Sequence, residues 1–197
     1  MKTLLLSIIA FVMLSCSAQE KPKLSLPVKA KEAYSYCLKN NMDTNYCILV
    51  DMSIHSGKYR LFVWDFNLNK IELSGICSHG SCDGKTGLGY PPTEAKFSNV
   101  PSSYCSSKGK YKIGNRGYSN WGININYKIH GMETTNNNAF KRIVVLHSWE
   151  AVPNEEIYPD YAPNSLGCPM VSNEMMRLLD DKLKDKKTPV LLWIFED

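Results

Sequence analysis

The chain has 197 residues, of which 44% are hydrophobic, and its formal net charge is +4. This length suits one domain with a single substantial core rather than several domains. One positive charge, Lys2, lies in a segment that we expect to be removed, so the remaining chain is only mildly basic. No long basic cluster interleaved with aromatic residues accompanies that charge, and we therefore expect no nucleic-acid partner.

Residues 1–19 have the pattern of an export signal, with an apolar run at 4–14 that is too short for a comfortable membrane span. The end of this run, Met-Leu-Ser-Cys at 13–16, resembles a bacterial lipobox, although Met13 stands where an aliphatic residue is usual. We predict that Cys16 is lipidated, which would anchor the protein to a membrane in the cell envelope or periplasm. The alternative is ordinary cleavage after Ala18, which would leave a soluble periplasmic or secreted protein.

Residues 20–27 are rich in Lys and Pro and poor in apolar residues, which indicates a tether to one folded domain at 28–197. Apolar residues then recur at three- and four-residue spacing, which predicts an amphipathic helix over about 28–40. The expected packing face of this helix consists of Ala30, Ala33, Tyr34, Cys37 and Leu38.

Short runs rich in β-branched and aromatic residues follow at 47–51, 60–64 and 71–77, and the turn-like breaks between them predict a meander. His55 lies in one of these turns, and we interpret it as a solvated polar residue. Alternation with period two at 122–127 predicts a half-buried strand. The glycines of 114–122 and the polar residues of 134–138 instead favour turns.

The C-terminal part has three predicted elements. The apolar, β-branched run at 142–146 predicts a buried strand that ends at His147. Ser172 is a suitable cap for a helix over about 173–183, and a last strand is predicted at 190–195. The expected buried face of this helix consists of Met175, Met176, Leu178, Leu179 and Leu183.

The chain contains seven cysteines, and export would permit disulfides. If Cys16 is lipidated and Cys168 is a nucleophile, an odd number remains, so at least one should stay unpaired. Spacing does not fix the connectivity, and the plausible bridges join Cys37 with Cys47, and either Cys77 or Cys105 with Cys82.

A metal site is a rival interpretation of one cysteine group. Cys77, His79 and Cys82 are close in sequence and could act as ligands. A fourth ligand at a familiar spacing is missing, however, and export favours oxidised cysteines. We therefore expect no metal and no cofactor.

His147 and Cys168 flank a polar, Pro-bearing loop at 150–164. If His147 ends a strand and Cys168 follows the loop, the two side chains can meet. A base that takes the proton of a thiol turns cysteine into a strong nucleophile at neutral pH. Such a pair is weak support for catalysis by itself, because most cysteines of exported proteins are structural.

The residues around this pair are more specific. His147 followed by Ser165-x-Gly167-Cys168 resembles the signature of bacterial L,D-transpeptidases, the YkuD-like peptidoglycan enzymes. From about 50 to 195 the chain resembles the murein L,D-transpeptidase catalytic-domain-like branch of that family. The ordered segments that carry this resemblance are Ser-His-Gly at 78–80, Phe-Ser-Asn at 97–99, Ser-Ser-Lys-Gly at 106–109, Asn-Asn-Ala at 137–139, Arg-Ile-Val-Val-Leu-His at 142–147 and Ser-Leu-Gly-Cys-Pro at 165–169.

The resemblance implies a mainly β, sandwich-like or barrel-like catalytic domain that acts on peptidoglycan stem peptides through a cysteine thioester. It implies that Cys168 is the nucleophile, that His147 is the base, and that the backbone carbonyl of Ser148 orients the imidazole. Backbone N–H groups near Gly167 and Cys168 would hold the oxyanion, and Ser165 belongs to the same substrate-binding motif. The acyl acceptor stays open, because an amine would give a transpeptidase and water a carboxypeptidase.

One departure from the family pattern affects the expected chemistry. The better-known motif is Ser-His-Gly-Cys, whereas this chain has Leu166 in place of the second histidine, and leucine cannot donate a hydrogen bond. We hypothesise that His79 partly fills this role; the alternative is that His79 caps a turn or packs structurally. A non-catalytic lipoprotein that only binds peptidoglycan is a further alternative.

Overall fold

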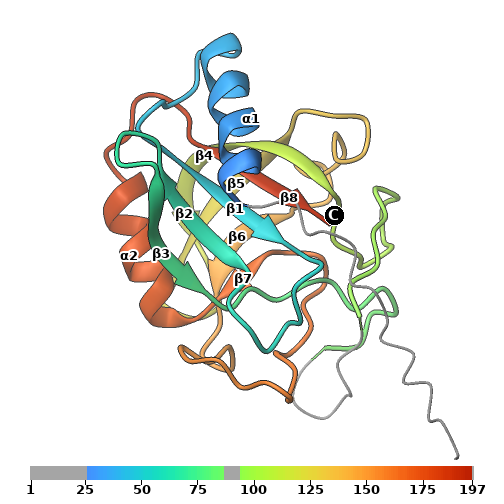
Figure 1. Cartoon of the computed structure of the whole chain (residues 1–197). Coiled ribbons are helices and arrows are strands. Elements are labelled where there is room, and N and C mark those ends of the chain that lie inside the picture. Colours follow the sequence, from blue (N-terminus) through green and yellow to red (C-terminus); the bar gives the residue numbers. More distant parts are fainter. Residues whose placement is uncertain (1–25, 87–93, 197) are drawn as a thin grey trace, which may run out of the picture.

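The computed structural model describes residues 26–86 and 94–196. The predicted lipidation site Cys16 and most of the predicted tether lie outside these described residues. In the described part of the chain, no helix is both long enough and apolar enough to cross a membrane. The elements, shown in Figure 1, are α1 (Leu26–Lys39), β1 (Tyr46–Asp51), β2 (Leu61–Asp65), β3 (Lys70–Gly75), β4 (Gly109–Tyr118), β5 (Ile125–Gly131), β6 (Val145–Ser148), β7 (Met170–Val171), α2 (Asn173–Leu183) and β8 (Leu191–Phe195).

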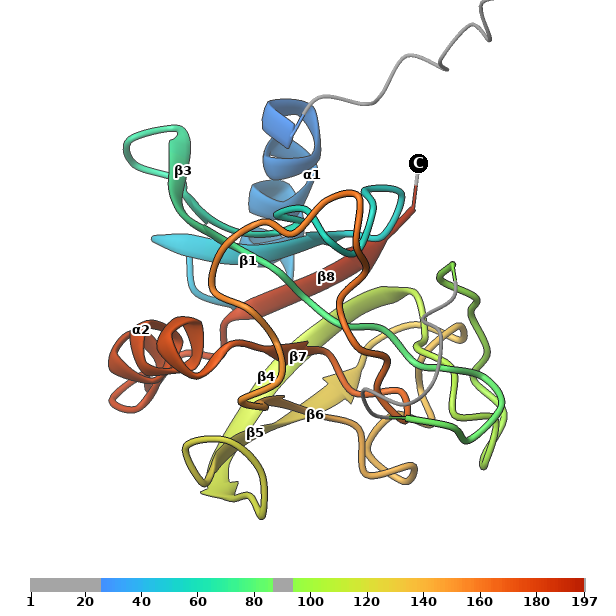
Figure 2. The same ribbon diagram turned by 90° about the horizontal axis from the view of Figure 1, so that it is seen from below.

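The strands form one 8-stranded sheet in the order β3-β2-β1-β8-β4-β5-β6-β7. Figure 2 shows that this sheet curls into a nearly closed barrel, with β1 to β3 on one side and β4 to β7 on the other. The predicted meander is confirmed, because β1 pairs antiparallel with β2, and β2 with β3. The mainly β class, with a helix at the start of the domain and a second one after Cys168, is confirmed as well.

The strands at the centre of the sheet are buried on both faces. In β1, Ile48 and Val50 point into the main core, whereas Cys47 and Leu49 pack beneath α1. The neighbouring strand β8 alternates in the same way, and it pairs parallel with β1. Because both faces are covered, these strands are continuous apolar runs in the sequence, without polar alternation.

Helix α1 begins two residues before the predicted domain boundary, so the predicted tether extended too far. Pro27 stands in the first turn of the helix, where its missing N–H leaves no hydrogen bond unmade. The small residues Ala30 and Ala33 are buried against the sheet as predicted, whereas Tyr34 is 39% and Leu38 56% exposed. The packing face is therefore narrower than the sequence pattern indicated.

Two strand predictions need correction at their ends. The turn predicted to begin at Gly114 is wrong in its first half, because β4 continues to Tyr118 with a register shift between Ile113 and Arg116. Glycine inside a strand often marks such an irregularity. Strand β6 begins at Val145 rather than at 142, because Ile143 has φ 58, which no strand residue adopts. His147 lies inside β6 rather than at its end, because the strand continues to Ser148.

Helix α2 directly follows β7 and is capped as predicted, with the Ser172 Oγ accepting a hydrogen bond from the Met175 N–H at 3.2 Å. Leu178 is the exception on its predicted buried face, since it is 42% exposed. Asp180 faces the sheet instead, where its carboxylate accepts hydrogen bonds from the Tyr127 hydroxyl and the Arg116 guanidinium. The helix thus ties the end of the β7 segment to β4 and β5.

The structure decides between the predicted disulfides. Cys82 is bonded to Cys105, whereas Cys37, Cys47 and Cys77 are buried free thiols. The predicted Cys37 to Cys47 bridge is therefore wrong. Both residues belong to the apolar layer between α1 and the sheet, and burial raises the pKa of Cys37 to about 12.

The rival metal site is not formed. The sulfur of Cys82, one of its three expected ligands, is in the disulfide with Cys105. Over residues 26–86 and 94–196, no cluster of three or more His, Cys, Asp or Glu side chains could hold a metal ion.

Candidate active site

Strand β6 fixes the position and the tautomer of His147. The strand lies between β5 and β7, where His147 is in register with Asn126 and Met170. The imidazole is 6% exposed, and its Nδ1 lies 3.0 Å from the backbone oxygen of Ser148. A carbonyl oxygen only accepts hydrogen bonds, so Nδ1 carries the proton and Nε2 keeps a lone pair. Burial lowers the pKa of His147 and so favours the neutral ring, although the hydrogen bond to the Ser148 carbonyl opposes this shift.

Cys168 follows the Pro-bearing loop and stands two residues before β7. The backbone N–H of His147 lies 3.5 Å from the carbonyl oxygen of Pro169, which brings the two segments together. The Cys168 Sγ accepts the Val145 N–H at 3.5 Å. Burial raises the pKa of the Cys168 thiol, while the Val145 N–H and the charge of Arg142 lower it. The thiol is therefore protonated at neutral pH until a base takes its proton.

His147 and Cys168 line the same pocket, which has a volume of about 260 Å³. Its walls are largely apolar, and the rings of Trp121 and Trp149 meet edge to face at 5.7 Å between centroids. Leu166, which replaces the second histidine of the family motif, is 47% exposed. The described lining residues are Thr86, Trp121, His147, Trp149, Ser165, Leu166, Cys168 and Met170.

The predicted oxyanion donors are not equivalent in the structure. The N–H of Gly167 donates to the Ser165 Oγ at 3.0 Å, so in this conformation it is already hydrogen-bonded. A short-range bond from a serine oxygen to the backbone two residues on satisfies that donor locally. The Cys168 N–H, in contrast, has no acceptor among the described residues. It is the better candidate for holding an oxyanion.

Gly167 is needed for a different reason. Its φ is +111, and a Cβ at this position would lie 2.8 Å from the carbonyl oxygen of Cys105. Only glycine combines this backbone conformation with such a close approach. The disulfide-bonded segment at Cys105 therefore packs directly against the residue that precedes Cys168.

Arg142 was missed as a site residue, because the sequence placed it at the start of a strand. Its guanidinium donates to the Cys105 carbonyl at 2.6 Å and to the Ser98 carbonyl at 2.9 Å. It also lines an adjoining cavity of about 400 Å³, which includes Leu166 and Cys168 in its wall. Two signals were available: Arg142 opens the family-like segment at 142–147, and it is a basic residue at the start of an otherwise apolar run. Trp121 and Trp149 were missed too.

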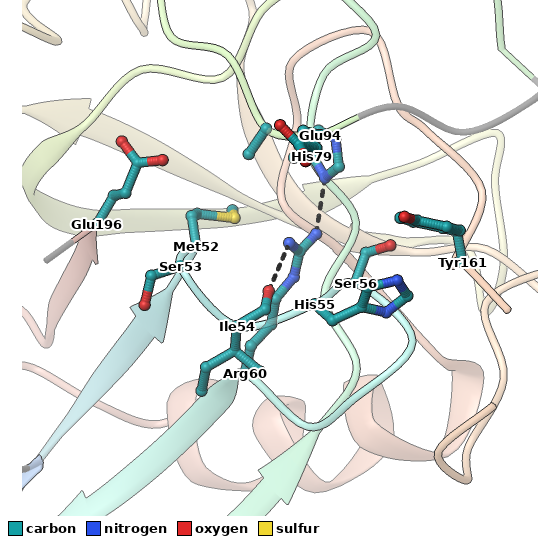
Figure 3. A pocket seen from close by; sticks show the side chains of 11 residues that line it. Met52, Ser53, Ile54, His55, Ser56, Arg60, His79, Glu94, Tyr161 and Glu196 are labelled. Carbon is teal, nitrogen blue, oxygen red and sulfur yellow. Dashed lines mark hydrogen bonds between the residues drawn. The ribbon is translucent and has the colours of Figure 1, made fainter. Parts of the chain in front are cut away.

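The structure does not bring His79 to the described lining of the Cys168 pocket. Its backbone is close, because the Ser165 N–H donates to the His79 carbonyl at 2.8 Å. Its side chain lies in another cavity, where the Nδ1 is 2.8 Å from the Arg60 Nη2, as Figure 3 shows. This arrangement favours the alternative that His79 packs structurally, and it leaves the Leu166 position without a neighbouring imidazole from His79.

The sequence of the whole domain settles the family. A family model described as the L,D-transpeptidase catalytic domain matches residues 19–193. The chain belongs to this family. A comparison of this L,D-transpeptidase domain with curated proteins found no significant match.

Two solved structures are similar to this L,D-transpeptidase domain. One is an L,D-transpeptidase from Xylanimonas cellulosilytica, with 13% identity, a TM-score of 0.40, and coverage of 82% of this chain and 68% of that one. The other is the helical cell shape determining protein Pgp2 from Campylobacter jejuni, with 14% identity, a TM-score of 0.43, and coverage of 83% of this chain and 55% of that one. At these TM-scores, the family assignment rests on the sequence match.

Proposed function

We propose that the protein is a cysteine acyl-transfer enzyme that cleaves peptidoglycan stem peptides through a thioester on Cys168. Its family supports a peptidoglycan-modifying enzyme. The observation that carries the proposal is the orientation of His147, whose Nδ1–H is held by the Ser148 carbonyl beside the pocket that contains Cys168. This leaves Nε2 as the basic atom, which is the requirement for a base that activates a thiol.

The proposed reaction has two steps. As the Cys168 Sγ forms a bond to the carbonyl carbon of the third stem-peptide residue, the Nε2 of His147 takes the thiol proton. Collapse of the tetrahedral intermediate breaks the C–N bond, and the imidazolium gives its proton to the departing amine of the terminal D-Ala. The resulting thioester is then attacked by an amine or by water, which restores the thiol.

The oxyanion of the first step would be held by the Cys168 N–H. One such donor contributes about 3 kcal/mol to transition-state stabilisation in other hydrolases. A second donor at Gly167 would require the Ser165 hydroxyl to release that N–H, since the two are bonded at 3.0 Å. We infer that Ser165 acts on the oxyanion indirectly, through the Gly167 backbone. The side chain of Leu166 would contribute only apolar contact.

The acceptor distinguishes two enzymes that share this thioester, and a third possibility is a protein that only binds peptidoglycan. The test is to incubate the purified protein with disaccharide-tetrapeptide and to identify the products by mass spectrometry, with Cys168→Ala as the control. Dimers would identify a transpeptidase, and tripeptide alone a carboxypeptidase. If the protein and the control both leave the substrate unchanged, the acyl-transfer proposal is wrong and binding alone remains.

We also propose that the protein is exported and attached to a membrane through lipid on Cys16. This rests on the sequence of residues 1–19 alone. Metabolic labelling with a fatty acid should label the wild-type protein but not Cys16→Ala. A soluble, unlabelled protein with a mature N-terminus at Gln19 would instead support ordinary cleavage after Ala18.

A further inference from the structure

A second cavity, of about 360 Å³, has a described lining that shares no residue with the Cys168 pocket. The two cavities share one structural connection, since His79 lines this one, Ser165 lines the pocket of Cys168, and their backbones are hydrogen-bonded at 2.8 Å. Figure 3 shows the side chains that line the second cavity. The described lining includes Met52, Ser56, Arg60, His79, Glu94 and Tyr161.

Arg60 places a positive charge in the wall of this cavity although it is only 1% exposed. Its three acceptors are all uncharged: the Cys77 carbonyl at 2.6 Å, the Ile54 carbonyl at 3.4 Å and the His79 Nδ1 at 2.8 Å. No carboxylate of the described residues lies within ion-pair distance of this guanidinium. A buried charge without a paired anion is costly, so an anion at this position would stabilise the protein.

Burial has a measurable consequence for this guanidinium. It lowers the pKa of Arg60 to about 10, although the charge of Asp51 opposes the shift. The Asp51 carboxylate already accepts the Ser53 hydroxyl and N–H groups. Arg60 nevertheless remains charged at neutral pH.

Hydrogen-bond donors in the cavity exceed the acceptors that the protein provides. A guanidinium has more N–H groups than the three acceptors of Arg60 use. The Ser56 Oγ is buried and has no hydrogen-bond partner in the structure. Because an arginine can only donate, the Nδ1 of His79 accepts, and its Nε2 carries the proton. The unused N–H groups of Arg60 and the Ser56 hydroxyl suit a ligand oxygen that accepts two or more hydrogen bonds.

The edge of the cavity has the opposite charge. Glu94 is exposed, lines the cavity and forms no ion pair with any residue that the structure describes. Glu196 also lines it, but its carboxylate pairs with Lys108 at 3.3 Å. The free carboxylate of Glu94 would repel a doubly charged anion such as phosphate, and it would attract an ammonium group.

We propose that this cavity binds a small α-amino acid as its zwitterion, with the ligand carboxylate on Arg60 and Ser56 and the ligand ammonium toward Glu94. A guanidinium matches a carboxylate through parallel N–H bonds. The ring of Tyr161, tilted by 46° against that of His55 with the centroids 4.0 Å apart, provides an apolar wall for the ligand's side chain. This site does not depend on catalysis at Cys168.

The test is an NMR titration of the purified full chain with each enantiomer of alanine, and with propionate and ethylamine as analogues that lack the ammonium or the carboxylate. We expect at least one enantiomer to give saturable shifts at the Arg60 side chain, with either analogue binding roughly tenfold more weakly. Absence of saturable shifts with both enantiomers would overturn the proposal. Equal binding of propionate would also overturn it and would indicate a simple anion site.

Variants assign the contacts. Ser56→Ala removes an unpartnered buried hydroxyl, so it should weaken alanine binding while leaving the thermal stability equal or higher. Glu94→Gln should weaken binding roughly tenfold, whereas Glu196→Gln, a matched change in the same cavity, should not. Unchanged alanine affinity in both Ser56→Ala and Glu94→Gln would contradict the proposed contacts.

Discussion

Two regions of this molecule each contain a cysteine and a histidine, and their environments are opposite. In the first, the Nδ1 of His147 donates to a backbone carbonyl, and the Cys168 sulfur lines an open pocket. In the second, the Nδ1 of His79 accepts from Arg60, and Cys77 is fully buried. The first histidine is left with a basic Nε2, and the second with an Nε2 that can only donate.

The comparison shows that the partner of one ring nitrogen decides what the other can do. A carbonyl partner prepares a base, whereas a guanidinium partner prepares a hydrogen-bond donor. The two thiols also differ, in their burial. Burial raises the pKa of Cys77 to about 12 even though the charge of Arg60 opposes it, and the residue is 0% exposed. Of these two regions, only the first combines an imidazole with a lone pair on Nε2 and a thiol that lines a pocket.

The largest expected effect on acylation comes from replacing each of the two cysteines, Cys168 and Cys77, by alanine. Cys168→Ala should lower acylation by tetrapeptide substrate or by a carbapenem by about 10³-fold or more, because no other described thiol lines the pocket. Cys77→Ala is the matched control and should still acylate. Intact-mass spectrometry measures both. An adduct that persists in Cys168→Ala would break the comparison.

The two histidines provide the next test. His147→Asn should slow acylation by about 10² to 10⁴, since it removes the base. His79→Asn should acylate at nearly the wild-type rate if its ring acts only in the second cavity. The measurement is the rate of adduct formation, with folding of both variants checked by circular dichroism. A large loss in a folded His79→Asn protein would revive a role for this residue beside Leu166.

Each of the two regions also has a close backbone contact that only glycine allows. A Cβ at Gly80 would lie 2.2 Å from the Tyr104 carbonyl, and one at Gly167 would lie 2.8 Å from that of Cys105. Either change to alanine should lower the free energy of unfolding by about 2 kcal/mol or more, as measured with urea. Gly117→Ala is the control, because its Cβ would meet only the Asn126 side chain at 3.2 Å. A destabilisation as large in the control would show that these close approaches are not special.

The smallest expected effect is on the pH dependence of stability. The pKa of His147 is lowered by burial from the ordinary value of 6.5, so the unfolded chain takes up a proton before the folded protein does. Unfolding free energy should therefore be highest above pH 6.5 and should fall as the pH drops toward the lowered pKa. Urea titrations of the wild type and of His147→Asn isolate this contribution. Equal pH slopes in the two proteins would mean that His147 is not desolvated.

The sequence was informative where the determinants are local. The capped helix after Cys168, the meander, and the strand that presents His147 all depend on short patterns, and the contact between His147 and the Ser148 carbonyl joins adjacent residues. The position of His147 and Cys168 on either side of the loop predicted that they could meet, and both residues line one pocket. These features need no knowledge of distant parts of the chain.

Features set by distant contacts could not be predicted. Whether the Gly167 N–H is free depends on the rotamer of Ser165, and the direction of the His79 ring depends on Arg60, which directly precedes β2. The hydrogen bonds of Arg142 to the Ser98 and Cys105 carbonyls were not predicted, because Ile143, with φ 58, breaks the strand that the sequence indicated there. The pairing of Cys82 depends on which cysteine the fold brings near. In each case the missing information is tertiary rather than compositional.

The bond between Cys82 and Cys105 has a practical consequence. Arg142, which contributes to the field at Cys168, is held in place by the carbonyl of Cys105 at 2.6 Å. Without this bond the Cys105 segment would be less constrained, and with it one of the acceptors that hold Arg142. Protein made under reducing conditions should therefore gain activity on oxidative refolding.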